Sequence, residues 1–96
     1  MKSVRFHHRA ESEMLGARDF YNAQLDDLGE NFIDEVERSI AMIQKSPTRW
    51  PIMEENFRGY VLQRFPFTIY YVNDPDDILI LAIAHQSRNP GYWKTR

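Results

Sequence analysis

The chain has no cysteine among its 96 residues, and glycine is scarce, with four positions. The lack of cysteine excludes a disulfide framework, a thiolate zinc site and a cysteine nucleophile. The few glycines form no glycine-rich phosphate-binding loop. His7 and His8 are adjacent on a predicted strand and point to opposite faces, so with His85 they make a poor metal site. We therefore expect neither a bound metal nor a cofactor.

Long apolar runs are missing as well. The N-terminal sequence MKSVRFHHRAESE is charged throughout and lacks the apolar core of about 7 to 15 residues that a signal peptide needs. No run approaches the roughly 18 apolar residues of a membrane span. An apolar fraction of 43% is nevertheless ordinary for a folded protein. These features predict one domain over residues 1–96, located in the cytoplasm and without membrane contact.

Acidic residues are absent from the last dozen positions, HQSRNPGYWKTR, although the whole chain has a formal net charge of -2. Arg88, Lys94 and Arg96 make this tail cationic, and Tyr92 and Trp93 add two aromatic rings. A chain of net negative charge is not built to bind nucleic acid over its whole surface. The tail is therefore the segment best suited to meet the acidic surface or the nucleic acid of a partner.

Apolar residues at spacings of three and four predict two helices in the first half of the chain. These residues are Ala10, Met14, Ala17, Tyr21, Leu25 and Leu28 in the first helix, and Phe32, Val36, Ile40 and Ile43 in the second. Gly29 separates the two patterns and is expected to end the first helix, which gives a helical hairpin. Ser46-Pro47 closes the second helix because the residue before a proline disfavours helical backbone.

Four segments have the β-branched, aromatic and aliphatic residues typical of strands. They are Ser3–His7, Tyr60–Arg64, Phe67–Val72 and Ile78–Ala84. The expected fold is α+β: an N-terminal strand, a helical hairpin, then an antiparallel three-stranded meander, with the helices packed on one face of the sheet.

The last of these strands is apolar on both faces. Strict alternation puts Ile78, Ile80, Ala82 and Ala84 on one face and Leu79, Leu81, Ile83 and His85 on the other. The strand should therefore be central in the sheet, with one face covered partly by another protein.

Short motifs accompany these elements. They are Ala17, Phe20 and Tyr21 in the first helix, Gly29 followed by Phe32, then Pro47 and Trp50-Pro51, RFPF before IYY, and ILILAIA followed by AHQSRNPGYW. In this order, the motifs resemble those of the RelE/ParE family of toxins. The resemblance covers nearly the whole chain. It implies the toxin of a type II toxin–antitoxin module, in a hetero-oligomer with a cognate antitoxin. The C-terminal segment of that antitoxin is expected to dock a helix on the toxin or to add a strand to it.

The resemblance implies one of two activities. RelE-like toxins are ribosome-dependent mRNA endonucleases, whereas ParE-like toxins poison DNA gyrase and need no cleavage chemistry. Metal-free RNA cleavage needs a base, an acid and cations that stabilise the charged phosphorane. The candidates for these roles are His85, Arg88, Tyr92 and Arg64.

The chain departs from the RelE-like pattern, which expects two lysines on the second sheet strand and an arginine on the third. Leu62, Gln63 and Arg64 stand near the lysine positions, and the third strand offers Thr68. The ending HxxRxPxYW looks more like ParE-type and plasmid-stabilisation proteins. We therefore favour inhibition of growth through gyrase binding, with the mRNA endonuclease and a non-toxic antitoxin-binding module as alternatives.

The residues expected to bind the target are Arg88, Tyr92, Trp93, Lys94 and Arg96. A tail that only binds should be removable from Arg88 onward with the fold intact. A structural interpretation of the same region stays open. In that interpretation His85 caps the core, and Tyr92 and Trp93 fold back and pack. Arg64 then pairs with Glu54 or Glu55.

Overall fold

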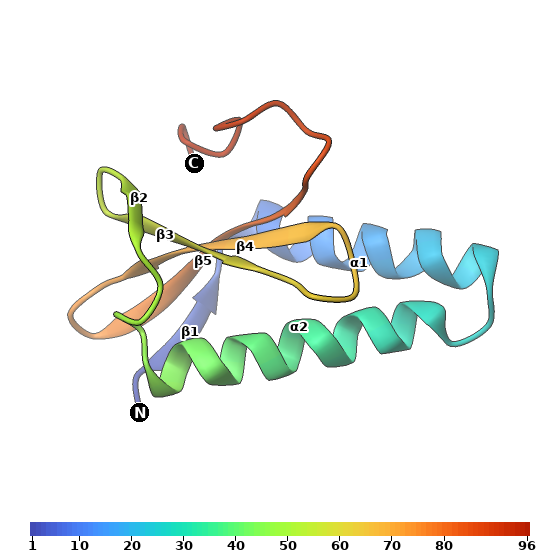
Figure 1. Cartoon of the computed structure of the whole chain (residues 1–96), viewed down its shortest axis with the longest axis horizontal. Coiled ribbons are helices and arrows are strands. Elements are labelled where there is room, and N and C mark those ends of the chain that lie inside the picture. Colours follow the sequence, from blue (N-terminus) through green and yellow to red (C-terminus); the bar gives the residue numbers. More distant parts are fainter.

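Five strands form one sheet in the order β1-β5-β4-β3-β2, and two helices cover one of its faces (Figure 1). The computed structural model describes residues 1–96. The elements are β1 (Ser3–Phe6), α1 (His8–Gln24), α2 (Leu28–Lys45), β2 (Ile52–Glu54), β3 (Phe57–Val61), β4 (Phe67–Asn73) and β5 (Asp77–His85). β1 is parallel to β5, while β5, β4, β3 and β2 pair antiparallel in turn. The predicted α+β fold is confirmed, and β5 is an interior strand, between β1 and β4.

The helical hairpin is present, but Gly29 does not end the first helix. α1 ends at Gln24, and Gly29 is the second residue of α2, where it is buried. A Cβ atom at this position would lie 2.2 Å from the backbone oxygen of Arg18, and the Asn22 side chain accepts a hydrogen bond from the Gly29 N–H at 2.7 Å. Glycine is needed here because the two helices approach closely.

The strand predicted at Tyr60–Arg64 lies three residues earlier, at Phe57–Val61. The reason is Glu35, a buried carboxylate on α2. It accepts hydrogen bonds from the N–H groups of Gln63 at 2.6 Å and Arg64 at 3.2 Å, and so holds them in a turn. The sequence interpretation also missed β2, a three-residue edge strand whose side chains are all exposed and which has no alternating pattern.

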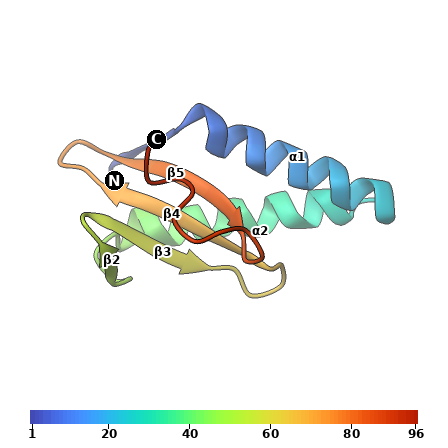
Figure 2. The same cartoon turned by 90° about the horizontal axis from the view of Figure 1, so that it is seen from above.

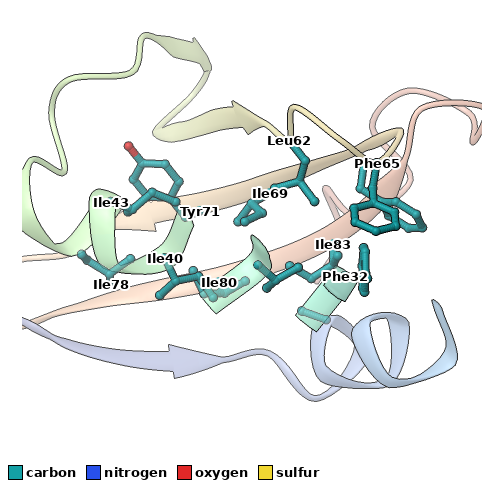
Figure 3. Packing of buried hydrophobic residues seen from close by; sticks show 13 residues of the cluster. Phe32, Ile40, Ile43, Leu62, Phe65, Ile69, Tyr71, Ile78, Ile80 and Ile83 are labelled. Atoms are coloured by element: carbon teal, nitrogen blue, oxygen red, sulfur yellow. The ribbon is translucent and has the colours of Figure 1, made fainter. Parts of the chain in front are cut away.

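The main core lies between the helices and one face of the sheet (Figure 3). Its largest fully buried side chains are Tyr71, Phe32, Ile43, Ile69, Ile78, Ile80, Ile83 and Val36. The Tyr71 hydroxyl donates to the Pro47 carbonyl at 2.7 Å, which ties the end of the helical layer to β4. Trp50, half-buried, packs on the edge of this core with its ring centroid 4.8 Å from that of Tyr60.

A β-bulge interrupts the predicted alternation of β5. Tyr71 lies opposite Ile80 but Tyr70 lies opposite Ala82, so Leu81 is an extra residue in β5. An extra residue moves the following side chains to the other face. Ile83 therefore joins Ile78 and Ile80 in the main core, while Ala82 and Ala84 join a second cluster on the far face. The predicted set of Ile78, Ile80, Ala82 and Ala84 on one face is wrong for this reason.

The far face of the sheet is covered by the chain's own tail, residues 86–96. Figures 1 and 2 show the tail running back over β4 and β5. The Trp93 side chain is buried against this face and stacks on Tyr70, with ring centroids 3.7 Å apart. Gly91, at a φ of 80°, makes the turn that returns the chain. The prediction that another protein covers this face is therefore wrong for the part of the face that the tail covers.

Candidate functional site at the C-terminal tail

Glu13, on α1, is the residue around which the tail is organised. Its carboxylate accepts hydrogen bonds from both terminal nitrogens of Arg96, at 2.8 and 2.9 Å, from the Tyr92 hydroxyl, and from the Ile83 N–H at 3.0 Å. The Glu13 and Arg96 side chains are only 16% and 7% exposed. We call Glu13, Tyr92 and Arg96 the clasp, because they join the tail to α1 and β5.

The clasp also occupies an open sheet edge. β1 reaches only as far as Phe6, opposite Ile80, so the outer edge of β5 has no partner strand from Leu81 onward. Glu13 accepts from the Ile83 N–H, and Arg96 donates to the Leu81 carbonyl at 3.1 Å. Two side chains thus satisfy backbone groups that a neighbouring strand would otherwise bind.

The clasp fixes the charges of its three members. Burial alone would raise the pKa of Glu13, but the hydrogen bonds from Arg96, Tyr92 and the Ile83 N–H outweigh burial and lower this pKa below its ordinary value of 4.5. Burial, together with the hydrogen bond to Glu13 and its charge, raises the pKa of Tyr92 to about 12. The hydrogen bond to Glu13 is the main cause of a raised pKa for Arg96. At neutral pH the clasp is therefore a carboxylate, a neutral phenol and a guanidinium.

Arg88 lies on top of the clasp and is exposed to solvent. Its guanidinium carbon is 4.0 Å from the centroid of the Tyr92 ring, a cation–π contact, while Arg96 approaches the same ring at 5.1 Å. Arg88 belongs to none of the ion pairs of the chain. The clasp therefore presents an exposed cation that has no acidic partner.

His85 stands beside this cation at the end of β5 and is half-buried. Its Nδ1 accepts from the Ser87 N–H at 3.0 Å and lies 2.7 Å from the Ser87 hydroxyl oxygen. The His85 ring meets the Phe67 ring edge-on, with centroids 5.0 Å apart. These contacts agree with the structural interpretation, in which His85 caps the core at the strand end.

A groove of about 360 Å³ runs between α1, the ends of β4 and β5, and the tail. We call it the α1 groove. Its lining residues are Ser12, Glu13, Gly16, Ala17, Phe20, Phe67, Ile83, His85, Arg88 and Tyr92. Three of the four proposed catalytic residues, His85, Arg88 and Tyr92, thus meet in one place.

Arg64 is not brought into this groove. It lines a separate hollow with Glu35, Arg38 and Tyr60, beside the turn that follows β3. Its predicted ion pair with Glu54 or Glu55 does not form; Glu54 pairs instead with Lys94.

The remaining tail residues have different surroundings. Trp93 is buried, so the expectation that it folds back and packs is confirmed. Lys94 is exposed and pairs with Glu54, and Arg96 is held by Glu13. Of the five residues predicted to bind the target, Arg88 is thus the exposed cation that no carboxylate neutralises.

The α1 groove has the features of a recognition surface. The Tyr92 proton is held by Glu13 and the phenol has a pKa of about 12, so at neutral pH it is a poor source of a proton for a leaving group. The exposed guanidinium over an aromatic ring, beside an apolar floor, suits contact with an acidic group on a protein.

A family model described as the ParE toxin of the type II toxin–antitoxin system parDE matches residues 4–90. The chain belongs to the ParE toxin family. Membership implies an antitoxin partner, because these toxins are defined as half of a toxin–antitoxin pair. The match ends at Pro90, so Tyr92, Trp93 and Arg96 lie beyond it.

The fold is that of a solved structure described as the chromosomal ParDE toxin–antitoxin system from P. aeruginosa. The two chains are 18% identical, with a TM-score of 0.78 over 88% of this chain and 96% of that one. No curated protein sequence matches this chain. No helix combines the length and the apolar character needed to cross a membrane.

Proposed function

We propose that this ParE-family chain arrests bacterial growth in the cytoplasm by binding DNA gyrase, and that a cognate antitoxin silences it. Membership of the ParE family is the observation that carries this proposal. The geometry supports it, because the α1 groove offers an exposed cation and an apolar floor, whereas Arg64, one of the four candidates for RNA cleavage, lies elsewhere.

The antitoxin is proposed to occupy a second groove, between β1 and the two helices. Six of its eight lining residues are hydrophobic: Val4, Phe6, Met14, Ile33, Val36 and Ile40. β1 is also an edge strand, with its outer side unpaired. A helix laid in this groove, or a strand added to β1, would cover apolar surface that the chain leaves open.

The target is proposed to bind at the tail, with unequal roles for the predicted residues. Arg88 and the Tyr92 ring form the contact surface, and Lys94 lies at its margin. Trp93 and Arg96 hold this surface in place, since both side chains are buried within the chain.

The first test is expression in a susceptible bacterium without the antitoxin, with plasmid supercoiling and mRNA integrity measured together. Gyrase poisoning predicts growth arrest with altered supercoiling or DNA breaks and intact message. Message cleaved between codons on ribosomes, with normal supercoiling, would instead establish the endonuclease alternative through His85, Arg88 and Tyr92. No growth defect alongside tight antitoxin binding would point to a non-toxic module.

Arg88→Gln tests the contact surface directly. Loss of a central interfacial arginine should raise the concentration needed to inhibit gyrase by at least about tenfold. Arg38→Gln is the matched control, because Arg38 is also exposed and outside every ion pair but lines the hollow on α2. Equal inhibition by Arg88→Gln and the wild-type chain would contradict this assignment.

A further inference from the structure

Gly16 has no structural reason to be glycine. It lies in the middle of α1, where glycine is the least favourable residue after proline. A Cβ atom added at Gly16 would meet nothing within 4 Å, whereas one added at Gly29 would collide with backbone. The φ of Gly16 is outside the left-handed range that favours glycine. Within the folded chain, alanine would therefore fit and would strengthen the helix.

Gly16 also lines the α1 groove. One helical turn further along α1 is Phe20, a groove residue that is 60% exposed. The missing side chain at Gly16 leaves the helix backbone open, so that an approaching chain can pack closely against α1 beside the Phe20 ring. An exposed aromatic ring next to an open backbone is favourable for packing a large apolar side chain.

The charge of the groove indicates which polar group a bound segment should have. Glu13 is the only acid that lines the groove, and Arg96 neutralises it. Arg88 lines the same groove without an acidic partner. A segment that enters the groove with a carboxylate would satisfy the guanidinium of Arg88.

We propose that the α1 groove is the binding site for an acidic and apolar segment of the target protein. A large apolar side chain packs against Gly16 and Phe20, and a neighbouring carboxylate pairs with Arg88. This rests on the proposed function, in which Arg88 contacts the target. The groove at β1 is less suitable than the α1 groove as a binding site for such a segment, because its polar lining residues are Glu37 and Gln44 and it contains no cation.

The experiment compares Gly16→Ala and Gly16→Leu with the wild-type chain. Gly16→Ala should raise the midpoint of thermal unfolding by about 3 °C, because it removes a helix-disfavouring residue. Gly16→Leu fills the groove and should raise the concentration needed for growth arrest and for inhibition of purified gyrase by tenfold or more. Antitoxin binding should be unchanged. Gln24→Leu, the control, makes an exposed change on α1 outside the groove and should alter none of these measurements.

The outcomes separate this inference from the proposed function. Growth arrest by Gly16→Leu at the wild-type concentration would overturn the inference. Loss of antitoxin binding with growth arrest retained would overturn it as well and would assign the groove to the antitoxin. Wild-type growth arrest without any effect on gyrase would refute the proposed function alone, and Gly16→Leu would still test the groove through growth arrest.

Discussion

At the scale of single residues, Glu13 joins three segments that are far apart in sequence. Its carboxylate binds the tail through Tyr92 and Arg96 and binds β5 through the Ile83 N–H. Because Arg88 rests on the Tyr92 ring, Glu13 also positions the exposed cation without touching it. The Glu13 carboxylate contributes its full stabilisation of the fold only while it is ionised.

Glu13→Gln should therefore weaken the fold in a pH-dependent way. At pH 7 the loss of the ion pair should lower the free energy of unfolding by roughly 1–3 kcal/mol. The pKa of Glu13 is lowered in the folded chain, so its contribution is complete above its ordinary value of 4.5 and is lost as the pH falls through the folded value. Urea unfolding of both proteins at pH 7 and at pH 3 checks this. A stability difference that does not shrink in acid would show that the charge of Glu13 is unimportant.

The sequence contained a signal for Glu13 that the interpretation missed. Glu13 lies three residues after Ala10 and four before Ala17, which places a carboxylate on the apolar face of α1. A charge in such a position needs a partner of opposite charge. The tail contains no acidic residue and offers three cations, Arg88, Lys94 and Arg96. Which cation pairs with it could not be predicted, since the return of the tail depends on the turn at Gly91 and on the burial of Trp93.

At the scale of elements, local pattern predicted the order of helices and strands, and long-range contacts determined their limits. The helical hairpin and the strands near Phe67–Val72 and Ile78–Ala84 follow from periodicity and β-propensity. The end of β3 depends on Glu35, which lies 28 residues from the Gln63 N–H it binds. The bulge at Leu81 has no local signal, because every residue around it is apolar.

The close approach of the helices predicts opposite effects for the same substitution at two glycines. Gly29→Ala puts a Cβ atom 2.2 Å from the Arg18 carbonyl oxygen and should lower the free energy of unfolding by about 2–3 kcal/mol. Gly16→Ala, its matched control, should raise that free energy by up to about 1 kcal/mol. Urea denaturation of both variants measures the difference. The hairpin packing described above would be wrong if both variants were stabilised equally.

At the scale of the whole molecule, the tail is a third layer, on the opposite face of the sheet from the helices (Figure 1). Trp93 of the tail forms a buried cluster with four residues of the sheet: Phe57, Leu81, Ala82 and Ala84. This burial argues against the expectation that the tail can be removed with the fold intact, because its removal would expose this cluster to water.

Deletion of residues 91–96 should lower the free energy of unfolding by at least about 3 kcal/mol, the typical effect of truncating a buried tryptophan. The deletion should also increase the binding of a hydrophobic dye, since the far face of the sheet would be uncovered. Lys94→Gln, which breaks only the exposed pair with Glu54, should leave stability within about 1 kcal/mol of the wild type. Stability unchanged after the deletion would mean that the tail is not part of the folded unit.

The pairing of β1 with β5 has a consequence for the timing of protein synthesis. Ser3 lies opposite Asp77, and Glu13 binds Arg96, so the first residues to be made find their partners among the last. At about 5–20 residues per second, a ribosome needs roughly 5 to 20 s to make the 96 residues. For about the second half of that interval, the sequence of both helices has been made but β5, which covers them in the folded chain, has not. The helices that line the proposed antitoxin groove are thus made several seconds before the surface around Arg88 is complete.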